Sequence, residues 1–177
     1  MPETIQLFRV LLAAPSDVTE EHALVADAIN NWNVQLGDGA RARIELMNWR
    51  THAHPEAGRR PQASINRQFA DRADLVLAIF WRRLGSPTGK AASGTVEEIE
   101  RARRRGKKVM VYFRQRLSAE KDAPDSREQA RMERFRRKLG RSALYGTYRD
   151  VQEFESTVRK DLALVMHEMV TIARKKR

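Results

Sequence analysis

Residues 93–100 read Ser93-Gly94-Thr95-Val96-Glu97-Glu98-Ile99-Glu100 and lie between two unbroken apolar runs, at 75–80 and 109–113. Unbroken apolar runs are typical of strands that are covered on both faces of a parallel sheet. A chain that connects two parallel strands crosses over through a helix, almost always with right-handed geometry. Residues 75–113 therefore predict a strand, a helix and a second strand, with the quoted stretch at the start of the helix.

Local chemistry at the start of this helix supports the prediction. Gly94 permits a tight turn, Thr95 can cap a helix, and Glu98 three positions later completes a T-x-x-E capping box. Asp17 and Glu20 form a similar pair at the predicted start of the first helix, where Ser16 is an alternative cap. Asp150 and Glu153 form such a pair at the start of the last helix.

The rest of the chain continues the alternation of strands and helices. Residues 5–13 form an apolar run, 42–46 alternate as an edge strand does, and 143–148 can add a short strand. Helices with one apolar face are predicted between Asp17 and Gly37, from about 127 to 139, and after Asp150. The apolar residues on these three faces are Val25, Ile29, Trp32, Leu36, Met132, Phe135, Leu139, Phe154, Val158, Leu162, Val165, Met169 and Ile172. Pro61 begins a further short helix with Ile65 and Phe69.

This order of elements predicts an α/β fold with three layers. We expect a five-stranded parallel sheet of order 2-1-3-4-5, the flavodoxin-like order, with helices on both faces. The length of 177 residues suits one domain over residues 1–177. No apolar run is long enough to span a membrane and no signal sequence begins the chain, so a cytoplasmic protein without a membrane partner is expected.

Composition excludes some chemistry and leaves one question open. The chain has no cysteine, and its four histidines lie outside metal-ligand spacing, so neither thiolate chemistry nor a metal site is expected. The net charge is +11, with basic residues concentrated at 101–108, 131–141 and 174–177. These runs are consistent with solvated helix faces or with a surface that binds nucleic acid, although no aromatic residues are interleaved for base stacking.

Candidate site residues follow the predicted strands, at the sheet edge where ligands bind in open α/β folds. They are Ala14, Pro15, Ser16 and Asp17 after the first strand, Trp49 and Arg50 after the second, Trp81, Arg82 and Arg83 after the third, Arg114 after the fourth, and Ser93, Gly94, Thr95 and Glu98 at the following helix. Arginines and a helix N-terminus suit phosphates, tryptophan can stack on a nucleobase or nicotinamide, and Glu98 can hold ribose hydroxyls. The alternatives are structural: core tryptophans, surface arginines, and helix caps at Ser16, Asp17 and Glu98.

Several motifs in one order resemble a known family. They are residues 73–80, Leu84-Gly85-Ser86-Pro87, residues 93–99, Gly106-Lys107-Lys108-Val109, residues 10–18, and Thr147-Tyr148-Arg149-Asp150 before Phe154-Glu155. Together they resemble the TIR-like bacterial family labelled DUF4062. The pattern is also similar to nucleoside 2-deoxyribosyltransferases, whose Gly-Thr-x-x-Glu-Ile signature falls on Gly94, Thr95, Glu98 and Ile99, and whose Ala-Gly-Pro falls on residues 13–15.

Both resemblances imply that Glu98 is the catalytic carboxylate in cleavage of an N-glycosidic bond. The TIR-like resemblance implies an NAD glycohydrolase, with NAD as substrate and no separate cofactor, acting in antiphage defence or signalling as a homo-oligomer with a sensor protein as partner. Arg82, Arg83, Ser16 and Trp81 would surround the dinucleotide. Ala14 replaces the transferase glycine and Ser93 its acidic residue, which counts against deoxyribosyl transfer.

Two other function classes remain open at this stage. The chain can be a TIR-like scaffold or interaction module without turnover, including one that binds nucleic acid through its basic helices. It can also be an N-glycosidase or transferase that acts on a nucleoside or nucleotide in place of NAD.

Overall fold

A computed structural model describes residues 4–47, 69–115 and 125–175. Five strands form one sheet: β1 (Gln6–Ala13), β2 (Ala42–Met47), β3 (Leu75–Phe80), β4 (Lys108–Arg114) and β5 (Gly146–Tyr148). Their order is β2-β1-β3-β4-β5, and all neighbours pair in parallel. The predicted strand order is confirmed, including the edge position of the alternating strand β2.

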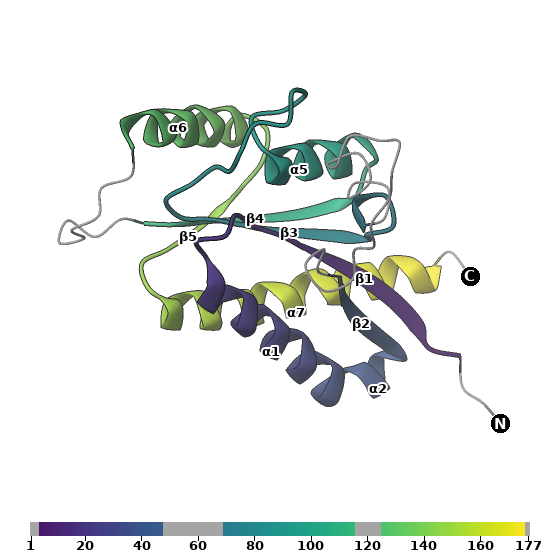
Figure 1. Cartoon of the computed structure of the whole chain (residues 1–177). Helices are drawn as coiled ribbons and strands as arrows, with labels where there is room; N and C mark the ends of the chain where they lie inside the picture. Colours follow the sequence, from purple (N-terminus) through teal and green to yellow (C-terminus); the bar gives the residue numbers. More distant parts are fainter. Residues whose placement is uncertain (1–3, 48–68, 116–124, 176–177) are drawn as a thin grey trace, which may run out of the picture.

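Helices cover both faces of the sheet (Figure 1). One face carries α1 (Thr19–Gln35) and α7 (Val151–Lys175), with the short α2 (Gly37–Ala40) after α1. The opposite face carries α5 (Gly94–Arg104) and α6 (Ser126–Gly140). The fold is therefore the predicted three-layer α/β arrangement.

The alternation of side chains along each central strand divides the core into two clusters. Leu75, Leu77 and Ile79 of β3 point toward α1 and α7, whereas Val76 and Ala78 point toward α5 and α6. All of β3 is buried, as expected for a central strand covered on both faces. Because the two clusters lie on opposite faces, a residue's cluster shows on which side of the sheet it lies.

Two details of the predicted helix faces are wrong. Leu36 is exposed, because α1 ends at Gln35 and the chain turns there into α2. On α7 the buried residues after Leu162 are Met166 and Val170. The predicted Val165 and Met169 are partly buried against the same core, while Ile172 is exposed. The buried α7 residues recur every fourth position, forming an oblique ridge that packs against α1.

Two predictions fall partly or wholly outside the described residues. The short helix after Pro61 and its Ile65 lie there, although Phe69 is described and is buried in the α5/α6 face. Within the described ranges, no helix is both long and apolar enough to cross a membrane.

Candidate functional site at the carboxyl edge of the sheet

Helix α5 begins two residues earlier than its sequence pattern indicates. Ser93 is the N-cap residue, and its side-chain oxygen accepts a hydrogen bond from the backbone N–H of Val96 at 3.2 Å. Thr95 already lies inside the helix, so the predicted capping box of Thr95 and Glu98 is wrong. Ser93 is the cap in place of Thr95 because its extended backbone directs its hydroxyl toward the first free N–H groups of the helix.

Glu98 consequently lies in the second turn of α5 and has no part in capping it. The residue is 4% exposed, and its neighbours in sequence, Glu97 and Ile99, are also buried. Val96 and Ile99 on the same helix anchor α5 to the face of the sheet that it shares with α6. Burial of a carboxylate costs free energy unless other groups compensate its charge. Buried carboxylates are frequent at functional sites.

Asp17 serves the loop after β3 instead of capping α1. Its Oδ2 atom accepts hydrogen bonds from the backbone N–H groups of Arg82 at 2.9 Å and Arg83 at 3.2 Å. Helix α1 begins after Val18 without a side-chain cap, so the predicted box of Asp17 and Glu20 is wrong. The loop after β1 and the loop after β3 are thereby joined, as expected for adjacent strands.

The other residues that follow β1 differ in exposure. Ala14 is buried against the α1/α7 face of the sheet, whereas Ser16 is exposed. Pro15 between them is half-buried. Trp49 and Arg50, predicted to follow β2, lie outside the described residues.

The indole ring of Trp81 lies close to two guanidinium groups. The guanidinium carbon of Arg82 is 4.0 Å from the ring centroid, and that of Arg114 is 4.3 Å from it. Both distances fit cation–π contacts. Trp81 also packs against the core cluster on the α1/α7 face, so it is partly a core aromatic and partly a support for the two arginines.

Glu21 is the buried counter-charge of this group. Its Oε1 atom accepts hydrogen bonds from Arg114 Nη1 at 3.2 Å and from the Tyr148 hydroxyl at 2.8 Å. The side chain of Glu21 is 1% exposed and that of Arg114 is 19% exposed. Burial, followed by the hydrogen bond to Glu21, raises the pKa of Tyr148 above its usual range, so its hydroxyl stays protonated and keeps donating.

Sequence reasoning missed Glu21 and Tyr148, although the sequence holds a signal for Glu21. Glu21 precedes Val25 by four residues, and Val25, Ile29 and Trp32 define the buried face of α1. A carboxylate at a core position of an apolar stripe requires a buried partner. The identity of that partner depends on tertiary structure, because Arg114 and Tyr148 come from β4 and β5.

The candidate residues thus form two groups on different sides of the sheet. Trp81 belongs to the α1/α7 face, and Glu98 is carried by a helix on the opposite face. The loop that runs from Trp81 to Ser93 connects the two groups. Within it, Thr88 donates a hydrogen bond to Glu97 at 2.5 Å, and Gly85 adopts a positive φ of 97° beside Ser93.

Helix α6 holds this connecting loop in place. The backbone N–H of Leu84 donates to Glu128 at 3.1 Å, and Arg131 donates to the backbone oxygens of Gly85 and Ala92. Arg131 also pairs with Glu128. In the parts of the chain that the structure describes, no group of three or more histidine or acidic residues forms a possible metal site.

The fold and the charged cluster define a three-layer α/β domain of flavodoxin-like strand order, with polar residues gathered at the carboxyl edge of its sheet. A family model described as "Domain of unknown function (DUF4062)" matches residues 16–163, and the chain belongs to this family. A search of the curated proteins found no match.

Proposed function

We propose that this chain is a TIR-like NAD glycohydrolase in which Glu98 is the catalytic carboxylate. The observation that carries the proposal is that Glu98 is 4% exposed on α5, while Ser93 does the capping that the sequence pattern assigned to Thr95 and Glu98. The N-terminus of the helix therefore does not require the Glu98 carboxylate. A buried acid without that structural duty suits a chemical role.

The proposed reaction is hydrolysis of the bond between nicotinamide and ribose in NAD. Nicotinamide leaves with the bonding electron pair, and water adds to the ribose carbon and releases a proton. An ionised Glu98 beside the ribose would stabilise the positive charge that develops on the sugar. Arg82, Arg83 and Ser16 would bind the phosphates, since Ser16 and Arg83 are exposed and Arg82 is half-buried at the carboxyl edge.

The experiment measures the release of nicotinamide from NAD by three purified proteins: the wild type, Glu98→Gln and Glu100→Gln. Protein concentration is high and a crowding agent is present, to favour the homo-oligomer that the proposal includes. Glu98→Gln keeps the side-chain size and is expected to lose activity by about 100-fold or more. Glu100 lies on the same helix and pairs with Lys138 at 2.8 Å, so Glu100→Gln is the matched control and should retain activity.

A nucleoside panel in the same assay separates NAD from the other N-glycosidic substrates. Equal nicotinamide release by the wild type and Glu98→Gln would refute the role of Glu98. Cleavage of nucleosides without cleavage of NAD would show that the substrate is a nucleoside and not NAD. No turnover of either substrate by assembled wild-type protein would favour a scaffold that acts through a sensor partner.

A further inference from the structure

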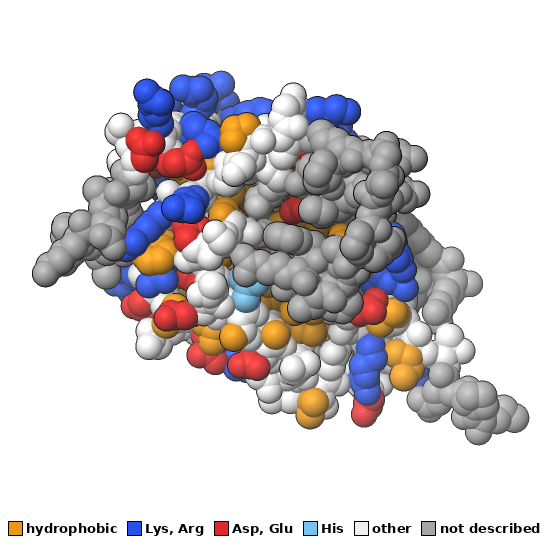
Figure 2. Space-filling view, in the orientation of Figure 1, with side chains coloured by type: hydrophobic (Ala, Val, Ile, Leu, Met, Phe, Trp, Pro, Cys, Tyr) orange, Lys and Arg blue, Asp and Glu red, His pale blue; other side chains and the backbone are white. Residues whose placement is uncertain are grey.

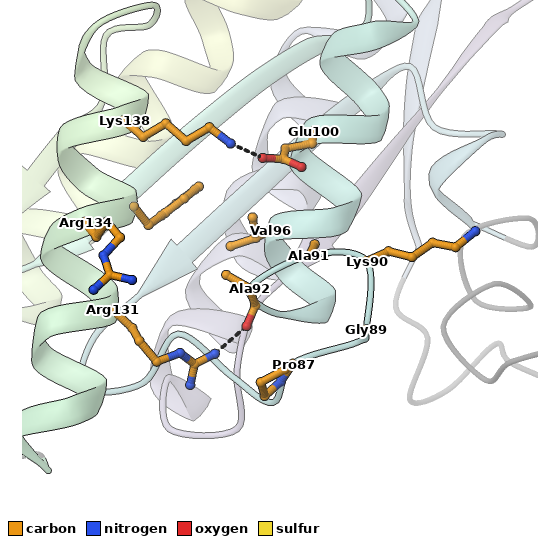
Figure 3. A pocket seen from close by; sticks show the side chains of 11 residues that line it. Pro87, Gly89, Lys90, Ala91, Ala92, Val96, Glu100, Arg131, Arg134 and Lys138 are labelled. Carbon is orange, nitrogen blue, oxygen red and sulfur yellow. Dashed lines mark hydrogen bonds and ion pairs between the residues drawn. The ribbon is translucent and has the colours of Figure 1, made fainter.

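A groove of about 580 Å³ lies between α5, α6 and the loop that precedes α5 (Figure 3). Its apolar lining includes Val96 from α5 and Phe135 from α6, with Ala91 and Ala92 from the loop. The volume falls within the range of ligand-binding pockets in proteins. The groove is separate from the cluster around Trp81, which lies on the other face of the sheet.

The α6 wall of the groove is basic. Arg131, Arg134 and Lys138 line it, and two bridges cross it: Arg131 reaches the backbone oxygen of Ala92, and Lys138 pairs with Glu100. Figure 3 shows Arg134 on the α6 wall between these two bridges. Within the described ranges, Arg134 makes no hydrogen bond or ion pair, and its side chain is exposed.

These three cations belong to a longer stripe along α6. Residues 127, 131, 134 and 138 of α6 and its C-cap residue 141 are all arginine or lysine, and spacings of four and three place them along one side of the helix. The stripe is about 21 Å long at a rise of 1.5 Å per residue. Figure 2 shows Lys and Arg side chains gathered along the edge of the molecule where α6 and α5 lie in Figure 1.

The shape of the groove and the charge of its α6 wall together indicate the class of ligand. A concave space of about 580 Å³ suits a flexible single strand, which can turn a base or a sugar into it, better than a double helix, whose bases stay stacked inside. Arginines and lysines in a row bind successive phosphates, and an apolar floor accepts sugars and base faces. The net charge of +11 would attract such a polyanion at a distance.

We propose that the cationic stripe of α6 and the groove beside it bind single-stranded nucleic acid through its phosphates, without sequence preference. Arg127 and Arg134 are the principal contacts, because both are exposed and Arg131 and Lys138 already have carboxylate partners. The proposal does not depend on the glycohydrolase activity. Glu98→Gln should therefore bind single strands as the wild type does.

The test is fluorescence anisotropy of a labelled fifteen-residue oligothymidine at several salt concentrations. Arg131 and Lys138 keep their carboxylate partners, so three phosphate contacts are expected, from Arg127, Arg134 and Arg141. Three contacts on a single strand give a slope of about −2 for log affinity against log salt. The double variant Arg127→Ala/Arg134→Ala should bind about tenfold more weakly at low salt, with a slope shallower by about 1.4. Arg134→Lys keeps the charge and should stay close to the wild type.

The matched control is Lys160→Ala/Lys175→Ala, which removes two exposed cations of α7 on the opposite face of the sheet. It should weaken binding by about twofold or less, because it changes only the overall charge. Equal losses in the two double variants would overturn the groove as the site. Tighter binding of a matched duplex, or displacement of the oligothymidine by polyglutamate at equal charge, would overturn single-stranded nucleic acid as the ligand.

Discussion

Glu21 and Arg114 lie 93 residues apart in the chain, and the Glu21 carboxylate accepts a hydrogen bond from the Arg114 guanidinium at 3.2 Å. The same Glu21 oxygen accepts from Tyr148, so one buried atom links α1 to the carboxyl ends of β4 and β5. Through Arg114 the contact extends to the ring of Trp81. Local order at the candidate site therefore depends on a carboxylate that is not itself proposed to touch substrate.

Replacement of Glu21 should destabilise the protein strongly. Glu21→Ala leaves the buried end of Arg114 without its partner carboxylate, and a cost of about 3–5 kcal/mol is expected for breaking a buried pair. Urea unfolding at pH 7 measures the loss. The control is Glu155→Ala in the Glu155–Arg159 pair of α7, where both side chains are 39% exposed and a loss below about 1 kcal/mol is expected. Similar losses in both variants would contradict the role of Glu21.

The capping of α5 can be tested by two substitutions that remove one hydroxyl each. Ser93→Ala should lower the free energy of unfolding by about 1 kcal/mol, because the Val96 N–H loses its acceptor inside a buried site. Thr95→Val keeps the side-chain volume and should cost less than half as much. Chemical denaturation of both variants gives the comparison. The reverse order of effects would restore Thr95 as the cap.

Stability in acid should depend on Asp71. The bidentate hydrogen bond from Arg101 lowers the pKa of Asp71 below its usual range, and charge attraction from Arg101 and Arg105 acts in the same direction. A lowered folded-state pKa adds stability above the unfolded-state pKa, about 3.9, which is lost as pH falls through the folded value. Asp71→Asn should thus be less stable than the wild type at pH 7.

The two proteins should converge in stability as the pH drops below about 4. Denaturant midpoints at pH 7, 5 and 3 measure the difference. A constant difference across this range would mean that the Asp71 charge is not the cause.

Two features of position 85 favour glycine: its backbone conformation and the closeness of Ser93. The φ of Gly85 is 97°, and a Cβ atom at this position would lie 3.2 Å from the Cβ atom of Ser93. Gly89 has a similar φ of 81° but open space around it. Both Gly→Ala variants should lose about 1–2 kcal/mol through backbone strain, and Gly85→Ala should lose more, because it also pushes against the α5 cap. Thermal unfolding measures both; a larger loss for Gly89→Ala would contradict the contact with Ser93.

Among the described residues, periodicity was sufficient to predict the strands and the long helices of this fold, but not the short helix α2. The apolar run at Leu75–Phe80 and the alternation of residues 42–46 distinguish a central strand from an edge strand, and the structure confirms both positions. Phe135 and Phe154 were likewise predicted to be buried, and they are. Helix starts were harder to predict, because Ser93 and Thr95 are both good caps and only the backbone geometry selects between them.

The candidate site was likewise predicted only in part from the sequence. The sequence indicated that Asp17, Trp81 and Arg82 follow strands that end at one edge of the sheet, and the hydrogen bond from the Arg82 N–H to Asp17 joins them there. It did not indicate that Trp81 and the helix of Glu98 lie on opposite faces. The face of a residue beyond a strand end depends on the path of its loop, which local pattern does not encode.

The sequence by itself determined the class of fold, the order of the strands and the identity of some residues near the carboxyl edge, among them Asp17, Trp81 and Arg114. These features follow from hydrophobic periodicity and crossover handedness, which act over short stretches of chain. Only the tertiary structure decided that Glu21 pairs with Arg114 and Tyr148 and that Ser93 caps α5. Such choices arise because a buried charge must find its partner among residues that are distant in sequence and adjacent only after folding.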